Sequence, residues 1–153
     1  MKTFVALGAL AALCHSVFGL DQGFYTIGSA SLQSNKFLNV NEEDGTSLIF
    51  SLNNDEYGSQ AWYFNLLESG NGREFFINST LSAGYINCGE QIKSPCFLGD
   101  EPQIFVAELA GEKSYELVSK ESGYFLRADV ENLQTAEWDQ SPNELFVLTP
   151  VDT

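Results

Sequence analysis

The segment Lys36-Phe37-Leu38-Asn39-Val40 recurs twice along the chain, as Gly84-Tyr85-Ile86-Asn87-Cys88 and as Tyr124-Phe125-Leu126-Arg127-Ala128. Each copy places an aromatic residue, an aliphatic residue and a polar or charged residue at consecutive positions. The aromatic positions of the three copies are 48 and 40 residues apart. Self-similarity at a nearly constant period indicates a fold built from repeated units.

The sequence on either side of each copy repeats as well. An aromatic segment precedes each copy, at 25–27, 75–77 and 115–117. A second apolar segment follows, at 60–64, 103–107 and 143–147, with Leu145 taken as the counterpart of Trp62 and Phe105. The first unit is the longest because it contains the extra loop 53–59.

These segments are typical of short strands. They are rich in Phe, Tyr, Ile, Leu and Val and are separated by clusters of Gly, Asn, Asp, Ser and Pro. Three units of four strands do not fit a propeller, which needs at least four such blades. The pattern predicts an all-β protein with a β-trefoil fold, in which three pseudo-repeats of about 40 residues form a six-stranded barrel with three hairpins. We expect Trp62, Phe105 and Phe125 in its core.

Residues 1–19 are typical of a secretory signal peptide. Lys2 precedes an apolar run, and Val17 and Gly19 are small enough at positions −3 and −1 for signal peptidase. Cleavage after Gly19 leaves one domain, 20–153, of 134 residues. We therefore expect a secreted, extracellular protein.

Charge and composition exclude several classes of function. Without Lys2, the mature chain has six basic and 21 acidic residues, so its net charge is −15. This charge disfavours binding to nucleic acids and to anionic membrane surfaces. The only histidine, His15, lies in the signal segment, so a Ser-His-Asp triad, a Cys-His dyad and a His-ligated metal site are unavailable to the mature chain. We predict a protein that is not an enzyme, holds no metal or cofactor and is monomeric.

Two modifications are expected in a secreted chain. Cys88 and Cys96 are the two cysteines of the mature sequence and are predicted to form a disulfide. Asn78 begins the sequon Asn78-Ser79-Thr80 and is a candidate for N-glycosylation if it is exposed.

Gln60-Ala61-Trp62 resembles the Gln-x-Trp motif that closes each unit of ricin-type lectin trefoils, and the segment 37–40 resembles their Cys-Leu-Asp-Val strand. The resemblance implies that Gln60 ties the hairpin and that Trp62 fills the core. It also implies a sugar site built from a carboxylate or amide, a polar residue, a stacking aromatic and an Asn before the Gln.

The sugar set is incomplete in every unit. In unit one, Asn39 takes the place of the Asp, Leu48 that of the polar residue, Phe50 that of the aromatic and Ser59 that of the Asn. In unit two, Asn87 stands for the Asp, whereas Pro102 replaces the Asn. In unit three, Arg127, Ala136 and Pro142 replace the polar groups and Trp138 is kept as the aromatic. The candidate sugar-binding residues are therefore Asn39, Phe50 and Trp138.

The chain is also similar in size and barrel pattern to mycocypin-like fungal trefoil inhibitors of cysteine proteases and to Kunitz-type plant inhibitors. The resemblance implies binding through the loops 28–35 and 53–59, with Gly28, Ser29, Tyr57 and Gly58 as contact residues. Arg73, in the loop 68–73, could act as bait for a trypsin-like pocket. Our first hypothesis is a secreted protease inhibitor or host-interacting effector, with an extracellular protein, preferably a cysteine protease, as its partner. The alternative is a ricin B-like, glycan-binding lectin with an atypical sugar site.

Overall fold

The computed structural model describes residues 19–52, 60–69, 71–81 and 83–152. They form twelve strands and one short 3-10 helix. The strands are β1 (Gly23–Ser29), β2 (Lys36–Val40), β3 (Leu48–Leu52), β4 (Trp62–Leu66), β5 (Glu74–Ser79), β6 (Tyr85–Cys88), β7 (Cys96–Gly99), β8 (Phe105–Leu109), β9 (Ser114–Ser119), β10 (Phe125–Asp129), β11 (Asn132–Ala136) and β12 (Phe146–Pro150); the helix η1 is Pro142–Glu144. Within these ranges no helix is long and apolar enough to cross a membrane.

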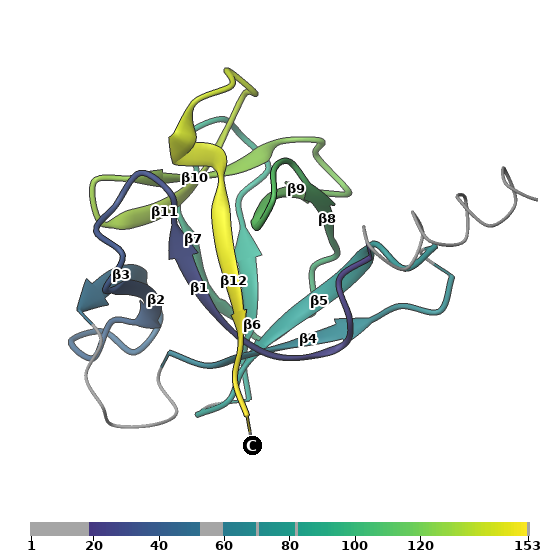
Figure 1. Ribbon diagram of the computed structural model, residues 1–153. Helices are drawn as coiled ribbons and strands as arrows, with labels where there is room; N and C mark the ends of the chain where they lie inside the picture. The colour runs from purple at the N-terminus through teal and green to yellow at the C-terminus, as the bar shows by residue number, and fades with distance from the viewer. Residues whose placement is uncertain (1–18, 53–59, 70, 82, 153) are drawn as a thin grey trace, which may run out of the picture.

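Six of the strands close into a barrel. β1 pairs with β4, β4 with β5, β5 with β8, β8 with β9, β9 with β12, and β12 returns to β1, every pair antiparallel. The last strand lies beside the first in Figure 1, where β12 is yellow and β1 purple. The remaining strands form three hairpins, β2–β3, β6–β7 and β10–β11, one in each unit. The predicted all-β trefoil with three pseudo-repeats is confirmed.

The core is made by inward-facing residues of all three units. Trp62, Phe105 and Phe146 each begin the closing strand of a unit and have no exposed surface. The sequence predicts Leu145 in the position that Phe146 takes, and this prediction is wrong, because Leu145 is the C-cap of η1 and is only partly buried. Phe125 is also only half-buried, with its ring against Trp138 at the surface, so its predicted place in the core is wrong.

The three hairpins contact one another and cover one end of the barrel. Asn132 on β11 pairs with Ile49 on β3, and isolated bridges join Ser47 to Phe97 and Pro95 to Gln134. These cross-unit pairs give the hairpins a fixed position relative to each other. As a result, the turn of one unit can contribute side chains to the surface of the next.

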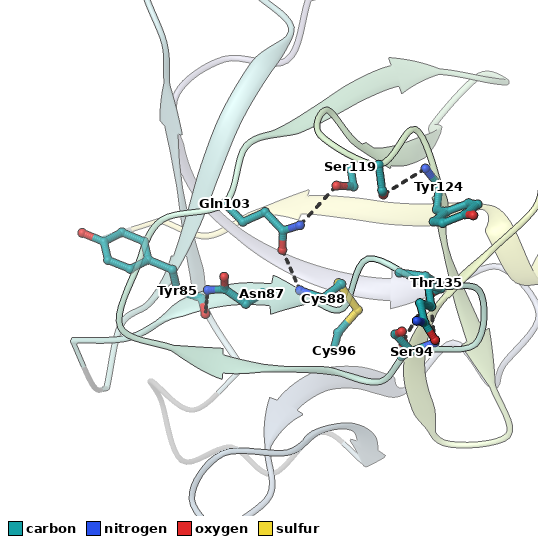
Figure 2. Close-up of a disulfide and its surroundings, with 11 residues drawn as sticks. Tyr85, Asn87, Cys88, Ser94, Cys96, Gln103, Ser119, Tyr124 and Thr135 are labelled. Atoms are coloured by element: carbon teal, nitrogen blue, oxygen red, sulfur yellow. Dashed lines mark hydrogen bonds between the residues drawn. A yellow bond between two sulfur atoms is a disulfide. The ribbon is translucent and has the colours of Figure 1, made fainter.

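The predicted disulfide is present. Cys88 and Cys96 lie opposite each other on β6 and β7 and are bonded, and both are buried. Figure 2 shows Gln103 beside the disulfide: its Oε1 accepts from the Cys88 N–H at 2.6 Å and its Nε2 donates to Ser119 Oγ at 3.2 Å. The second unit is therefore fixed to the third by a polar side chain as well as by strand pairing.

Candidate functional site

A pocket of about 530 Å³ opens on the outer side of the unit-one hairpin. Its walls come from β2, β3 and the turn that follows β2, and the turn between β10 and β11 of unit three contributes Glu131. Its lining includes Lys36, Asn39, Glu42, Glu43, Ile49, Ser51 and Glu131.

Asn39 is the buried polar group of this pocket. Its side chain is only 5% exposed, and its Nδ2 makes one long hydrogen bond, 3.4 Å, to Ser51 Oγ. Its Oδ1 has no hydrogen-bond partner among the described residues. A buried acceptor without a donor costs about 1–3 kcal/mol, so the native state gains if a ligand supplies the donor. Asn39 therefore combines burial, an acceptor without a donor and a place in the pocket lining, and its role in binding stays a prediction.

The register of the hairpin corrects the rest of the predicted sugar set in this unit. Asn39 pairs with Ile49, and neighbours on a strand face opposite sides, so Leu48 and Phe50 point inward. Phe50 is 1% exposed and stacks on Phe146 in the core, with 6.4 Å between ring centroids. Phe50 as a sugar-stacking ring is therefore wrong. The half-buried residues beside Asn39 are Ile49 and Ser51, neither of which the sequence singled out.

The motif residues after this hairpin act as expected. Gln60 Nε2 donates to the carbonyl oxygens of Ser51 and Leu52, at 3.3 and 3.1 Å, and ties the end of β3 to the entry of β4. Trp62 is fully buried, and its Nε1 donates to the Leu38 carbonyl oxygen at 3.0 Å. Both contacts fix β2 and β3 around Asn39. Ser59, which precedes Gln60, lies outside the described residues.

In unit two, the side-chain N–H groups of the equivalent asparagine are engaged within the unit. Asn87 Nδ2 donates to the carbonyl oxygens of Tyr85 and Glu101, at 3.2 and 2.7 Å. A pocket of about 590 Å³ lies beside it, lined also by Glu90, Gln103 and Lys120. The two asparagines occupy matching strands, yet Nδ2 of Asn87 makes two hydrogen bonds to carbonyl oxygens, whereas Nδ2 of Asn39 makes one long hydrogen bond and its buried Oδ1 has no donor among the described residues.

Unit three presents an exposed aromatic ring with charged neighbours. Trp138 is 51% exposed, lies beyond the end of β11, and donates from Nε1 to Glu116 Oε1 at 3.1 Å. Arg127, on β10, forms an ion pair with Asp139 at 2.8 Å. The structure thus places the predicted residue Trp138 at the surface, and Arg127 has Asp139 as its partner.

Glu144 is a buried acid that the sequence did not single out. It stands two residues before Phe146, as Gln60 and Gln103 stand before Trp62 and Phe105. Its Oε1 accepts from the Asp139 N–H at 3.1 Å, while Oε2 has no partner among the described residues. Burial, together with the nearby Asp139 carboxylate, raises the pKa of Glu144 above its ordinary value. The backbone N–H of Ser141 and the Glu144 carboxyl lower the pKa of Asp139.

The residues predicted for protease binding lie in different environments. Gly28 and Ser29 were expected in an exposed loop, but both are buried at the end of β1, paired with Val147 and Phe146 on β12. The exposed part of that loop therefore starts at Ala30, and the two contact assignments are wrong. Tyr57 and Gly58 lie outside the described residues. Arg73 is exposed at the end of the turn before β5, and its carbonyl oxygen accepts from the Ala107 N–H at 2.9 Å.

Asn78 lies within β5 rather than on a loop. Its side-chain Oδ1 accepts from Asn65 Nδ2, and the residue is half-buried. A glycan would be attached to Nδ2, which donates to the Ser79 carbonyl oxygen at 3.4 Å, and glycosylation of Asn78 stays a prediction. No group of three or more His, Cys, Asp or Glu side chains that could hold a metal ion occurs in the part of the chain that the structure describes.

The closed barrel, the three hairpins and the threefold arrangement define a β-trefoil protein. No protein-family model matches the sequence, and a search of curated proteins finds no match. Among solved structures, the designed threefold symmetric protein ThreeFoil is 17% identical with a TM-score of 0.70, over 84% of this chain and 99% of its own. A ricin B-like lectin of Macrolepiota procera, solved in complex with lactose, is 14% identical with a TM-score of 0.74, over 86% and 99%.

SeviL, solved with the asialo-GM1 saccharide bound, is 14% identical with a TM-score of 0.68, over 86% of this chain and 100% of its own. At these identities the likeness establishes the shared trefoil fold.

Proposed function

We propose that this trefoil binds carbohydrate in the unit-one pocket. The observation that carries the proposal is the buried amide of Asn39, whose Oδ1 lacks a donor and which lines a pocket of about 530 Å³. Sugar hydroxyl groups are donors as well as acceptors, and an amide can meet both. Two trefoils of similar structure were solved with saccharides, lactose and the asialo-GM1 saccharide, which supports this choice of ligand class.

Each residue of the pocket has a distinct role in this proposal. Asn39 accepts from one sugar hydroxyl, and Ser51 Oγ, beside it, offers a second polar contact. Ile49 supplies an apolar surface for the C–H face of the ring, because Phe50, the aromatic residue in the described lining, is buried. Lys36, held by Glu131 at 2.8 Å, places a donor at the rim. The expected mode is hydrogen bonding at the hairpin with little aromatic stacking.

The test is a titration of the purified protein with lactose and with N-acetylglucosamine oligomers, followed by calorimetry. Asn39→Leu removes the donor and the acceptor of the side-chain amide at nearly constant volume. It should weaken binding about tenfold, since a net hydrogen bond contributes about 0.5–1.5 kcal/mol. Ser51→Ala should weaken it less. The matched control is Asn87→Leu in unit two, which should leave the affinity of unit one unchanged. If Asn39→Leu binds as well as the wild type, the site assignment is wrong.

Protease inhibition is a second candidate, and one observation favours it. Arg73 is exposed next to a backbone held by the hydrogen bond from Ala107, and an inhibitory loop needs such rigidity. The assay is inhibition of trypsin-like and papain-like proteases, with Arg73→Ala as the variant and Lys113→Ala as an exposed basic control. Secretion is also part of the proposal: N-terminal sequencing of the protein from culture medium should begin at Leu20.

A further inference from the structure

The unit-one pocket carries more negative charge than its ion pair neutralises. Glu42 and Glu43 follow β2, and Glu131 reaches the pocket from the β10–β11 turn. Lys36 is the one basic residue among those described as lining the pocket, and it is paired with Glu131. Glu42 and Glu43 take part in none of the ion pairs found among the described residues. Two carboxylates of the pocket are thus uncompensated.

Asn39 gives a second, independent indication, because its buried acceptor in the same pocket lacks a hydrogen-bond donor. Its amide is 5% exposed and its Oδ1 is unpartnered within the described chain. An acceptor at the base of the pocket and two free carboxylates at its rim favour a ligand that is rich in N–H donors and positively charged. A protonated amino group on a sugar ring supplies both, since an ammonium has three donors and no acceptor.

We propose that the unit-one pocket selects saccharides that carry a free, protonated amino group, such as the glucosamine units of deacetylated chitin. The inference rests on the proposed carbohydrate binding and specifies its ligand. The whole-chain charge of −14 acts in the same direction, because it attracts cationic oligomers over a longer range and repels sialylated or sulfated ones.

Unit two shows why charge alone does not make the site. Its pocket also has acidic side chains, Glu90, Glu101 and Glu121, beside Lys120. Its asparagine, Asn87, differs from Asn39 in two ways: Nδ2 donates to two backbone carbonyl oxygens, and Oδ1 is not among the buried acceptors without a partner in the described chain. We therefore assign the amino-sugar site to unit one.

The experiment compares three tetrameric ligands by calorimetry at low and moderate salt. They are the glucosamine tetramer, its fully N-acetylated form and a tetralysine peptide. We expect the glucosamine tetramer to bind at least about fivefold more tightly than the acetylated one, because exposed charge pairs each contribute a modest free energy. This preference should shrink as salt is added.

Two variants locate the preference. Glu42→Gln/Glu43→Gln should bring the ratio of the two sugar affinities close to one. The control, Glu68→Gln/Asp152→Asn, changes the net charge equally at exposed positions outside the described pockets and should keep the ratio. Equal reduction by both pairs of substitutions would assign the preference to overall charge and overturn the site.

The remaining outcomes separate this inference from the proposed function. Equal binding of both sugar tetramers overturns the amino-sugar preference and leaves carbohydrate binding in place. Tetralysine bound as tightly as the glucosamine tetramer overturns the sugar specificity and points to a cationic peptide. Absence of binding to any saccharide overturns the proposed function and this inference with it.

Discussion

Trp62 Nε1 donates to the carbonyl oxygen of Leu38 at 3.0 Å and thereby joins the first residue of β4 to the strand that carries Asn39. The indole is fully buried, so the same side chain fills the core and positions the candidate binding strand. This bond connects residues 24 positions apart and holds the unit-one hairpin against the barrel.

Replacing Trp62 tests the two contributions separately. Trp62→Phe keeps most of the packing but leaves the Leu38 carbonyl oxygen without its donor, at a cost of about 1–3 kcal/mol. Trp62→Ala should cost about 3–5 kcal/mol of unfolding free energy. Thermal or urea unfolding measures both, with and without saccharide. Wild-type stability in Trp62→Ala would contradict the core placement.

The same substitution at the two equivalent asparagines, Asn39 and Asn87, should have different effects on stability. Asn39→Leu removes a buried acceptor without a donor and should leave the melting temperature unchanged or raise it. Asn87→Leu breaks two hydrogen bonds to backbone carbonyl oxygens and should cost about 1–3 kcal/mol. Differential scanning calorimetry of both variants gives the comparison. A larger loss in Asn39→Leu would mean that Asn39 serves the fold rather than a ligand.

Glu144→Gln should stabilise the protein near neutral pH. The pKa of Glu144 is raised in the folded state, so its contribution is fully present below the ordinary pKa of a glutamate and is lost as the pH rises through the raised value. The glutamine variant, which carries the residue type found at positions 60 and 103, does not undergo this loss.

The melting temperatures of Glu144→Gln and wild type should coincide in acid and diverge in favour of the variant toward neutral pH. A difference of constant size at all pH values would show that ionisation of Glu144 is not its source.

Phe50 and Trp138 are both predicted as sugar-stacking rings, but replacing them should have very different effects on the free energy of unfolding. Phe50→Ala opens a cavity in the core and should cost about 3–5 kcal/mol. Trp138→Ala removes a half-exposed ring and should cost about 1 kcal/mol or less. Urea unfolding of both variants suffices. Equal losses would place Trp138 in the core.

The Cys88–Cys96 bond should contribute modestly to stability. Replacing both cysteines by alanine should cost about 2–3 kcal/mol, because the bond closes a short loop. Reductant should lower the melting temperature of the wild type to that of the double variant and leave the double variant unaffected. Alkylation of either cysteine without prior reduction would show that the bond is absent from the protein.

The sequence repeat was enough to predict the trefoil, because each unit contributes the same order of strands. It was not enough to place side chains around the hairpins. Asn39 pairs with Ile49 and Asn87 with Phe97, both ten residues on, but Arg127 pairs with Gln134, only seven residues on. Using the same spacing between the two hairpin strands in every unit therefore fails in unit three. There, the position that corresponds to Phe50 is Trp138, which lies beyond the end of β11.

A shift of one residue explains the error in unit one. Inward and outward positions alternate along a strand, so an offset that is wrong by one exchanges the core face for the surface face. Phe50 was assigned to the surface for this reason, and Ile49 and Ser51 were missed. Glu131 could not be found from local sequence at all, because it reaches the pocket through pairing between the first and third units.

The pairing of β1 with β12, from Tyr25 with Pro150 to Ser29 with Phe146, has a consequence for the order of folding. A ribosome releases the partner of the first strand only after the other strands of this domain, so the barrel stays open until β12 has emerged. Contacts between such distant segments slow folding, since the loop must close before they stabilise anything. The same pairing brings the two ends of the domain together. In a circularly permuted chain that joins these ends and begins at another turn, β12 and β1 would be consecutive in sequence, and their pairing would be a local contact.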